Sequence, residues 1–151
     1  MNQTRLHLFL ALLICSGCLL FVAFSVGSQV PEVKVVVNPS VDSKDLSVEQ
    51  IRRIFSMRQT TWSNDQTITV YVLANQHQTH QVFSTKVLGM FPYQLDRIWN
   101  KLVYSGLGEE PIKLQSEEEM LERVSQEPGA IGYVMQPINL DKINVIKVLE
   151  K

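Results

Sequence analysis

Cysteine is scarce in this 151-residue chain, and both copies lie close to its start. Cys15 and Cys18 fall inside a long apolar run, where a Cys-x-x-Cys redox or metal site is the less favoured interpretation. No cysteine follows residue 18, so the remainder of the chain must fold without a disulfide framework. A chain of this length can bury a core large enough to do so.

Basic residues are not in excess either. Residues 1–28 hold one of the 14 basic residues and none of the 15 acidic ones, so residues 29–151 carry 13 basic and 15 acidic residues. This balance disfavours nucleic acid as a partner, because domains that bind it usually present a basic patch.

Motifs of catalysis are missing as well. The sequence has no Gly-x-Ser-x-Gly elbow and no phosphate-binding loop that ends in Gly-Lys. His77 and His80 lie three residues apart at the start of a predicted helix and could share a face, but the spacing offers no third metal ligand. The acidic run Glu117–Glu119 is typical of a first helical turn, where acids complement the helix dipole. The sequence therefore predicts no enzyme, no cofactor and no metal site.

Apolar residues, in contrast, are abundant near the start. Arg5 is followed by an uncharged and mostly apolar run over residues 8–26, and then by small residues. This order is typical of a secretory signal. It predicts that residues 1–28 direct the chain to the periplasm and are removed by cleavage after Ser28, or after Ser25.

Two alternatives for this segment stay open. The apolar run is close to the roughly 20 residues that span a bilayer, so it could be kept as a membrane anchor. It could also be a lipoprotein signal that ends at Cys18. Either alternative still predicts export from the cytoplasm.

Residues 29–151 alternate between strand-like and helix-like segments, which predicts one α/β domain with a mixed or mostly parallel sheet flanked by helices. Ser47 with Gln50, and Ser116 with Glu119, have the spacing of helix capping boxes. The predicted strands are Val33–Asn38, Thr67–Leu73, Ile112–Leu114, Ala130–Val134 and Asn144–Leu149. The predicted helices are Val48–Met57, Gln76–Leu88, Pro92 to just before Gly106, and Ser116–Gln126.

Two strand-to-helix junctions are candidate binding sites. In an open α/β sheet, ligands gather at the carboxyl ends of strands, and helix starts there offer free backbone N–H groups that suit anions. One junction is Asn38-Pro39-Ser40, and the other runs from Ala74 to Thr79. The predicted ligand-binding residues are Asn38, Ser40, Asn75, Gln76 and Thr79. The alternative for all five is ordinary turn and capping duty.

Several spaced motifs together resemble one known family. They are Val36-Val37-Asn38-Pro39, Ile51-Arg52-Arg53-Ile54-Phe55, Thr61-Trp62, Val87-Leu88-Gly89, Ser105-Gly106 and, most specifically, Gly129-Ala130-Ile131-Gly132-Tyr133-Val134. In this order they resemble the second lobe of the substrate-binding proteins of phosphate ABC transporters. The resemblance implies a periplasmic-binding-protein-like lobe of type II that works outside the cytoplasm. The predicted partners are a small, phosphate-like anion and a membrane transporter or envelope protein.

The chain departs from that family in two ways. It has material for about one lobe, whereas family members close two lobes on the anion. Family members also bind phosphate through an Arg-x-Asp-x-Ser-Gly-Thr type segment, and here the corresponding stretch, residues 73–80, keeps at most Thr79 of it. Two functions follow as hypotheses. The first is a solute-binding domain for uptake or sensing, and the alternative is a ligand-free module that docks on an envelope protein.

Overall fold

The computed structural model describes residues 32–135 and 142–149. The predicted export segment, residues 1–28, lies outside this part of the chain. Within the described ranges, no helix is long and apolar enough to cross a membrane.

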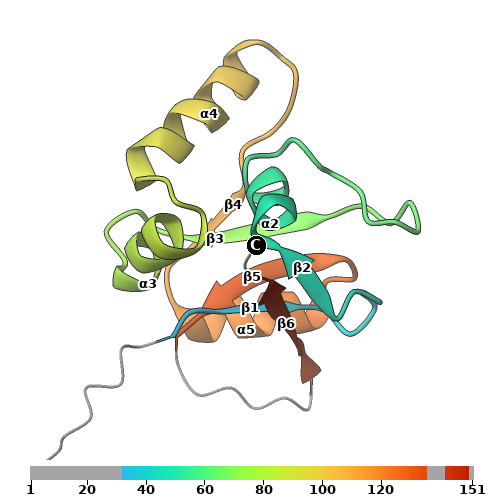
Figure 1. Ribbon diagram of the computed structural model, residues 1–151. Coiled ribbons are helices and arrows are strands. Elements are labelled where there is room, and N and C mark those ends of the chain that lie inside the picture. The colour runs from blue at the N-terminus through green and yellow to red at the C-terminus, as the bar shows by residue number, and fades with distance from the viewer. Residues whose placement is uncertain (1–31, 136–141, 150–151) are drawn as a thin grey trace, which may run out of the picture. The chain divides into compact units, whose positions relative to one another are not determined.

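Six strands of the described part form one sheet, with helices on both of its faces (Figure 1). The strands are β1 (Lys34–Val37), β2 (Asp45–Ser47), β3 (Thr69–Leu73), β4 (Ile112–Leu114), β5 (Ala130–Val134) and β6 (Asn144–Leu149). The helices are α2 (Val48–Phe55), α3 (Gln78–Val82), which continues as a π-helix η1 (Phe83–Val87), α4 (Pro92–Tyr104) and α5 (Glu117–Gln126). All five predicted strands are present, and β2 is an additional one.

The sheet has the order β2-β6-β1-β5-β3-β4 and is mixed but mostly parallel, as the alternating segments predict. The pairs β2–β6, β3–β4 and β3–β5 are parallel, whereas β1 runs antiparallel to both β5 and β6. The sheet therefore has two distinct ends. We call the end where β3 and β5 finish the groove end, and the end where β1 finishes the turn end.

Central strands are built for burial on both faces. Val35, Val36 and Val37 of β1 are fully buried, which explains the continuous valine run. Along β5, alternate residues face opposite sides of the sheet. A Cβ atom added at Gly132 would collide with Met120 of α5, so α5 packs directly on this glycine.

The opposite face of β5 is covered by α2 and by the helix formed by α3 and η1 (Figure 1). Tyr133 stacks on Phe83 of η1 with ring centroids 3.8 Å apart, and Phe55 of α2 lies 5.7 Å from the Tyr133 ring. Trp99 of α4 is also buried and donates its Nε1–H to the Phe55 carbonyl at 2.9 Å. These aromatic rings join three helices into one core.

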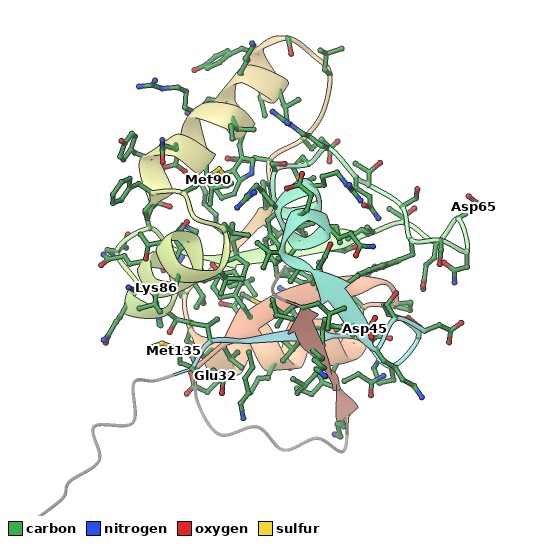
Figure 2. All side chains as sticks on the ribbon, in the orientation of Figure 1. Glu32, Asp45, Asp65, Lys86, Met90 and Met135 are labelled. Carbon is green, nitrogen blue, oxygen red and sulfur yellow. The ribbon has the colours of Figure 1, made fainter. Side chains whose placement is uncertain are left out.

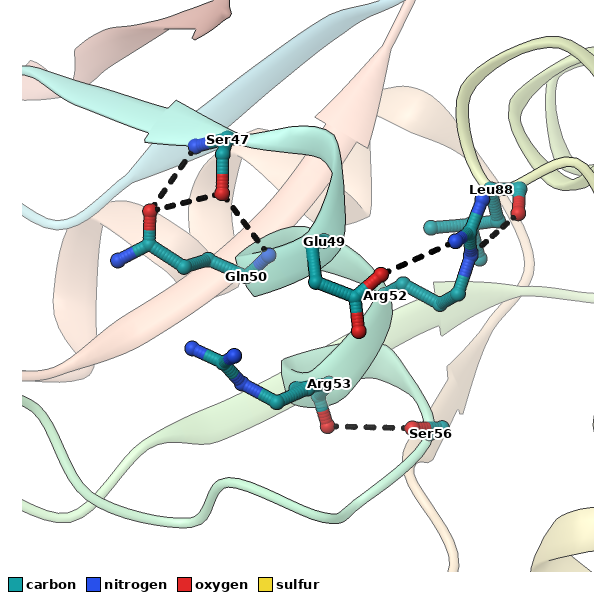
Figure 3. Close-up of polar contacts among 7 residues, drawn as sticks. All are labelled: Ser47, Glu49, Gln50, Arg52, Arg53, Ser56 and Leu88. Carbon is teal, nitrogen blue, oxygen red and sulfur yellow. Dashed lines mark hydrogen bonds and ion pairs between the residues drawn. The ribbon is translucent and has the colours of Figure 1, made fainter. Parts of the chain in front are cut away.

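Helix α2 starts as its capping-box spacing predicts (Figure 3). The Gln50 N–H donates to Ser47 Oγ at 3.2 Å, and the Ser47 N–H donates to Gln50 Oε1 at 3.0 Å. Arg52 then ties α2 to the end of η1, because its Nε donates to the Leu88 carbonyl at 2.9 Å. The same guanidinium forms an ion pair with Glu49 at 3.1 Å.

The predicted helix over residues 76–88 is present, but its second half is a π-helix. The Leu88 N–H donates to the Phe83 carbonyl at 3.1 Å, five residues back. The helix stops at Gly89, whose φ of 64° is the left-handed geometry that glycine adopts without strain. Met90 then leads into α4 (Figure 2). This connection sets where α4 begins relative to α3.

Candidate functional site

The junction after β3 forms a tight turn that leads into α3. The His77 N–H donates to the Ala74 carbonyl at 2.8 Å, and the His77 side chain caps α3 by accepting from the Thr79 N–H at 3.2 Å. Asn75 is half-buried in this turn, and Gln76 is exposed. The turn therefore presents two amide side chains at the groove end of the sheet.

Thr79, the one residue that could be kept from the phosphate-binding segment, points inward. Its side chain is buried, and its hydroxyl donates to the carboxylate of Glu117, which is also buried. The second Glu117 oxygen accepts the Met135 N–H at 3.0 Å. The Thr79 hydroxyl thus ties α3 to the start of α5.

A groove of about 650 Å³ opens beside this turn, between α3–η1 and the start of α4. Its volume falls in the range of small-molecule sites. Its lining residues are Asn75, Gln81, Val82, Thr85, Phe91, Pro92, Tyr93 and Asp96. Asp96 is the one carboxylate among these lining residues, and none of them is basic.

Two polar contacts define the inner part of the groove. Asn75 Nδ2 donates to Asp96 Oδ2, which joins the turn to α4. Asn75 Oδ1 is buried and has no hydrogen-bond partner in the part of the chain that the structure describes. Within the described ranges Asp96 forms no ion pair, since the two that occur there are Arg52–Glu49 and Lys113–Glu110. The groove therefore contains an acceptor and a carboxylate that the protein itself leaves partly unsatisfied.

An aromatic pair forms the outer wall. Phe91 and Tyr93 are 57% and 60% exposed, and their rings stack 5.8 Å apart with 11° between their planes. Pro92 between them occupies the first turn of α4, where its missing N–H costs nothing. Gln94 fixes the helix start by accepting the Phe91 N–H at 2.8 Å.

Asn38 and Ser40 lie at the turn end of the sheet, away from the β3–α3 junction, because β1 is antiparallel to β5. Asn38 Nδ2 donates to the carbonyls of Val124 and Ser125 at 2.8 and 3.0 Å, and its Oδ1 accepts the Ser40 N–H at 2.9 Å. Ser40 Oγ accepts the Gly129 N–H at 2.9 Å. Both side chains are thus occupied by holding the end of α5 and the start of β5.

Trp62 also serves the turn end. Its ring is 6% exposed, and Nε1 donates to the Gly129 carbonyl at 2.9 Å. Gly129 itself has a φ of 78°, and an added Cβ would collide with the Thr67 carbonyl. These contacts account for the first glycine of the most specific sequence motif, whereas Gly132 is explained by its contact with α5.

The two histidines have separate structural roles. His77 caps α3, while His80 is fully buried and places Nδ1 2.5 Å from the Tyr133 hydroxyl. Tyr133 Oη also accepts the Leu73 N–H at 2.9 Å, so this hydroxyl contacts both β3 and the imidazole of α3. No group of three metal-ligating side chains occurs in the ranges that the structure describes.

Burial controls the ionisation of this internal pair. Desolvation lowers the pKa of His80 to about 4, although the Asp96 charge acts in the opposite direction. Desolvation also raises the pKa of Tyr133 above its usual value. His80 is therefore neutral at pH 7, and its Nε2 is buried without a hydrogen-bond partner among the residues that the structure describes.

Of the five predicted ligand-binding residues, Asn75 lines the groove, Gln76 is exposed beside it, and Thr79 lies buried below it. Asn38 and Ser40 are at the other end of the sheet. The sequence reasoning did not identify Phe91, Tyr93 and Asp96, which lie on or before α4. The only signal for them was a pair of aromatic residues around the proline of a helix start, followed by an acid one turn later.

A search of curated proteins finds no match. Among solved structures, the fold matches a protein assigned as the phosphate ABC transporter substrate-binding protein of Clostridium perfringens, solved with bound phosphate. The TM-score is 0.62 at 19% identity, over 77% of this chain and 44% of that one. An ABC-type phosphate transport receptor from Vibrio cholerae gives a TM-score of 0.57 at 18% identity, over 77% and 45%. A phosphate-binding protein from Stenotrophomonas maltophilia gives 0.55 at 18%, over 78% and 39%.

These matches show the fold, and the chain spans less than half the length of each of the three structures. The predicted lobe architecture is thereby confirmed, because one such lobe accounts for about half of a two-lobed protein. A family model for the PBP superfamily domain matches residues 30–145, which is most of the chain. This protein therefore belongs to the PBP superfamily domain family and has the fold of one part of the phosphate-binding proteins.

Proposed function

We propose that this chain is the ligand-binding domain of an extracytoplasmic uptake or sensing system, and that it binds a small solute without altering it chemically. The observation that carries the proposal is the groove beside the β3–α3 turn. It lies at the carboxyl end of a parallel strand, where open α/β sheets bind their ligands. Membership of a family of binding proteins supports the same function.

The chemistry of the groove supports binding rather than catalysis. A general base must reach the proton it removes, and a nucleophile needs such a base beside it. The hydroxyl of Thr85 donates to the Gln81 carbonyl at 2.7 Å, and the nearby imidazole of His80 is buried with Nδ1 held by Tyr133. The remaining lining groups are amides, apolar side chains, the phenol of Tyr93 and one carboxylate.

Phosphate or another small anion, which the family resemblance implies, stays a prediction. Anion sites usually provide basic side chains or several free N–H and O–H donors. Among the described residues that line the groove there is no lysine, arginine or histidine. The Thr79 hydroxyl, a candidate donor, is engaged with Glu117. The geometry therefore gives more support to a neutral or cationic polar solute.

Thermal unfolding in the presence of solutes tests this function. The full chain would be expressed, purified and unfolded with a panel of amino acids, amines, sugars, phosphate and sulfate. A ligand at 100 times its Kd adds about 2.7 kcal/mol to the free energy of unfolding, which for a domain of this size raises Tm by about 5–10 °C. We expect at least one small solute to produce such a shift.

A matched pair of variants locates the binding. Thr85→Trp places a large ring in the groove and should abolish the shift. Glu122→Trp adds the same ring to an exposed position of α5, on the opposite face of the sheet, and should leave the shift intact. An unchanged Tm with every solute, or an equal shift in both variants, would rule out solute binding in the groove.

A second function, docking on an envelope protein, is favoured by one observation. The large apolar side chains that are exposed in the described part concentrate around α4, at Phe91, Tyr93, Val103, Tyr104, Leu107 and Ile112. Contiguous exposed apolar residues often mark a protein interface. This function would gain support if no solute changes Tm and a photo-crosslinker at position 104 captures one defined membrane protein in intact cells.

A further inference from the structure

The groove carries a negative charge, as a binding site for a cation does. Asp96 is its one charged lining residue, and the described part of the chain offers it no ion-pair partner. Its hydrogen bond from Asn75 is neutral and engages one of its two oxygens. A carboxylate in a partly enclosed groove attracts a positive charge more strongly than one at the open surface does.

The one buried lining atom of the described part that lacks a hydrogen-bond partner is an acceptor. The Asn75 amide donates to Asp96 through Nδ2, while its Oδ1 is buried and has no partner among the described residues. Buried acceptors without partners are uncommon and call for a donor. Ammonium and guanidinium groups are donors only, so they could satisfy Asn75 Oδ1 and Asp96 together.

The aromatic wall adds a second attraction for positive charge. The stacked rings of Phe91 and Tyr93 are more than half exposed, so a ligand can reach their faces. A cation over an aromatic face within about 6 Å of the centroid is stabilised by the ring quadrupole. Val82 and Pro92 complete the lining with apolar surface that suits a short hydrocarbon stem.

We propose that the groove binds a small organic cation, an ammonium or guanidinium group on a short apolar stem. The cationic group lies at Asp96 and Asn75, and the stem lies along the Phe91–Tyr93 pair. This ligand class has the charge opposite to that of the phosphate for which the structurally similar proteins are named. The inference rests on the proposed function and specifies its ligand.

Isothermal titration of the purified full chain with 1,4-diaminobutane and agmatine tests the proposal. The matched probes are 1,4-butanediol, which keeps the stem without charge, and inorganic phosphate. We expect binding of the amines alone. We also expect the affinity to fall as NaCl rises from about 20 to 500 mM, because salt screens a partly exposed ion pair.

Variants assign the contact to individual residues. Asp96→Asn retains an acceptor for Asn75 but removes the charge, and it should weaken amine binding about tenfold or more. Asp42→Asn makes the same change at an exposed position outside the groove and should leave the Kd unchanged. Tyr93→Ala should weaken binding, whereas Tyr104→Ala, at the other end of α4, should not. Far-UV circular dichroism confirms that each variant is folded.

The outcomes separate this inference from the proposed function. If 1,4-butanediol, phosphate or another solute binds in the groove and the amines do not, the cation proposal is wrong while solute binding stands. Amine binding with equal affinity in Asp96→Asn, or without salt dependence, would also overturn the cation proposal. If no solute of either panel binds, both proposals fail. The salt series on the wild-type chain tests the cation proposal even if a variant does not fold.

Discussion

At the scale of single residues, the core is organised around a hydroxyl. Tyr133 Oη accepts the backbone N–H of Leu73 and is hydrogen-bonded to His80 Nδ1, so one side chain links β5, β3 and α3. Such a buried chain of hydrogen bonds specifies one packing of the helix on the sheet, because any shift leaves a polar group without a partner. The same residues lie directly below the turn that carries Asn75.

This arrangement predicts acid sensitivity. Burial lowers the pKa of His80 from 6.5 to about 4, so between these values the unfolded chain binds a proton that the folded chain does not. Its contribution to stability is complete above pH 6.5 and is lost as the pH falls towards 4. At about 1.4 kcal/mol per pH unit, the loss amounts to about 3 kcal/mol. Urea unfolding at several pH values measures it.

Two variants control this experiment. His80→Phe removes the ionisable group, so its free energy of unfolding should fall less steeply between pH 6.5 and 4 than that of the wild type. Tyr133→Phe keeps the buried imidazole and should retain the steep dependence. Parallel pH profiles for the wild type and His80→Phe would contradict the assignment.

At the scale of elements, α2 depends on its first turn. Ser47 Oγ accepts the Gln50 N–H, and Ser47 is also the last residue of β2, so this residue joins a strand to a helix. Ser47→Ala should lower the free energy of unfolding by about 1 kcal/mol, the usual cost of a lost N-cap. Ser63→Ala, in an exposed loop, should change it by less than about 0.5 kcal/mol. Equal values for the two variants would show that the cap contributes nothing.

Elements with strong local patterns could be predicted from the sequence, and others could not. The valine run of β1 follows from burial along one chain segment, and α4 has Pro92 at its start and Gly106 just after its end. The three residues of β2, Asp45–Ser47, have no such pattern, because this strand exists only through its pairing with β6. The π-turn of η1 likewise depends on how residues 83–88 pack against α2 and α4.

The residues of the candidate site likewise include some that could be predicted from the sequence and some that could not. Asn75 could be predicted because it follows a strand directly, and it does line the groove. Asp96 lies 21 residues later and reaches Asn75 only through the packing of α4. The sequence could not reveal that the Thr79 hydroxyl donates to Glu117, because Glu117 lies 38 residues away. The separation of Asn38 from Asn75 follows from the direction of β1, which no local signal reveals.

At the scale of the whole molecule, the last strand holds the sheet together. Strand β6 lies between β1 and β2, so it pairs the start of the domain with its end. Contacts of such high sequence separation make folding depend on the complete chain. The domain should therefore unfold in one transition, in which the fluorescence of Trp62 and Trp99 changes together with the far-UV signal.

Two neighbouring positions of β6 test this cooperativity. Ile146 is 3% exposed and Val145 is 38% exposed. Ile146→Ala should lower the free energy of unfolding of the whole domain by about 2–4 kcal/mol, while Val145→Ala should cost well under about 1.5 kcal/mol. A tryptophan signal that is insensitive to Ile146→Ala would mean that β6 and β2 detach on their own.

The directions of β1 and β6 also determine where a tag or label can be attached without covering the groove. Lys34 pairs with Val134, and Leu149 pairs with Ser47 on the side where β1 starts, so the described fold begins and ends at the groove end. A purification tag or sensor surface joined directly before Lys34 or after Leu149 would lie at the same end of the sheet as the proposed binding groove. The loop before β3 lies at the turn end of the sheet, and Ser63 on this loop is exposed. Ser63→Cys would give residues 29–151 a single thiol for a fluorophore or for oriented immobilisation, with the groove facing solution.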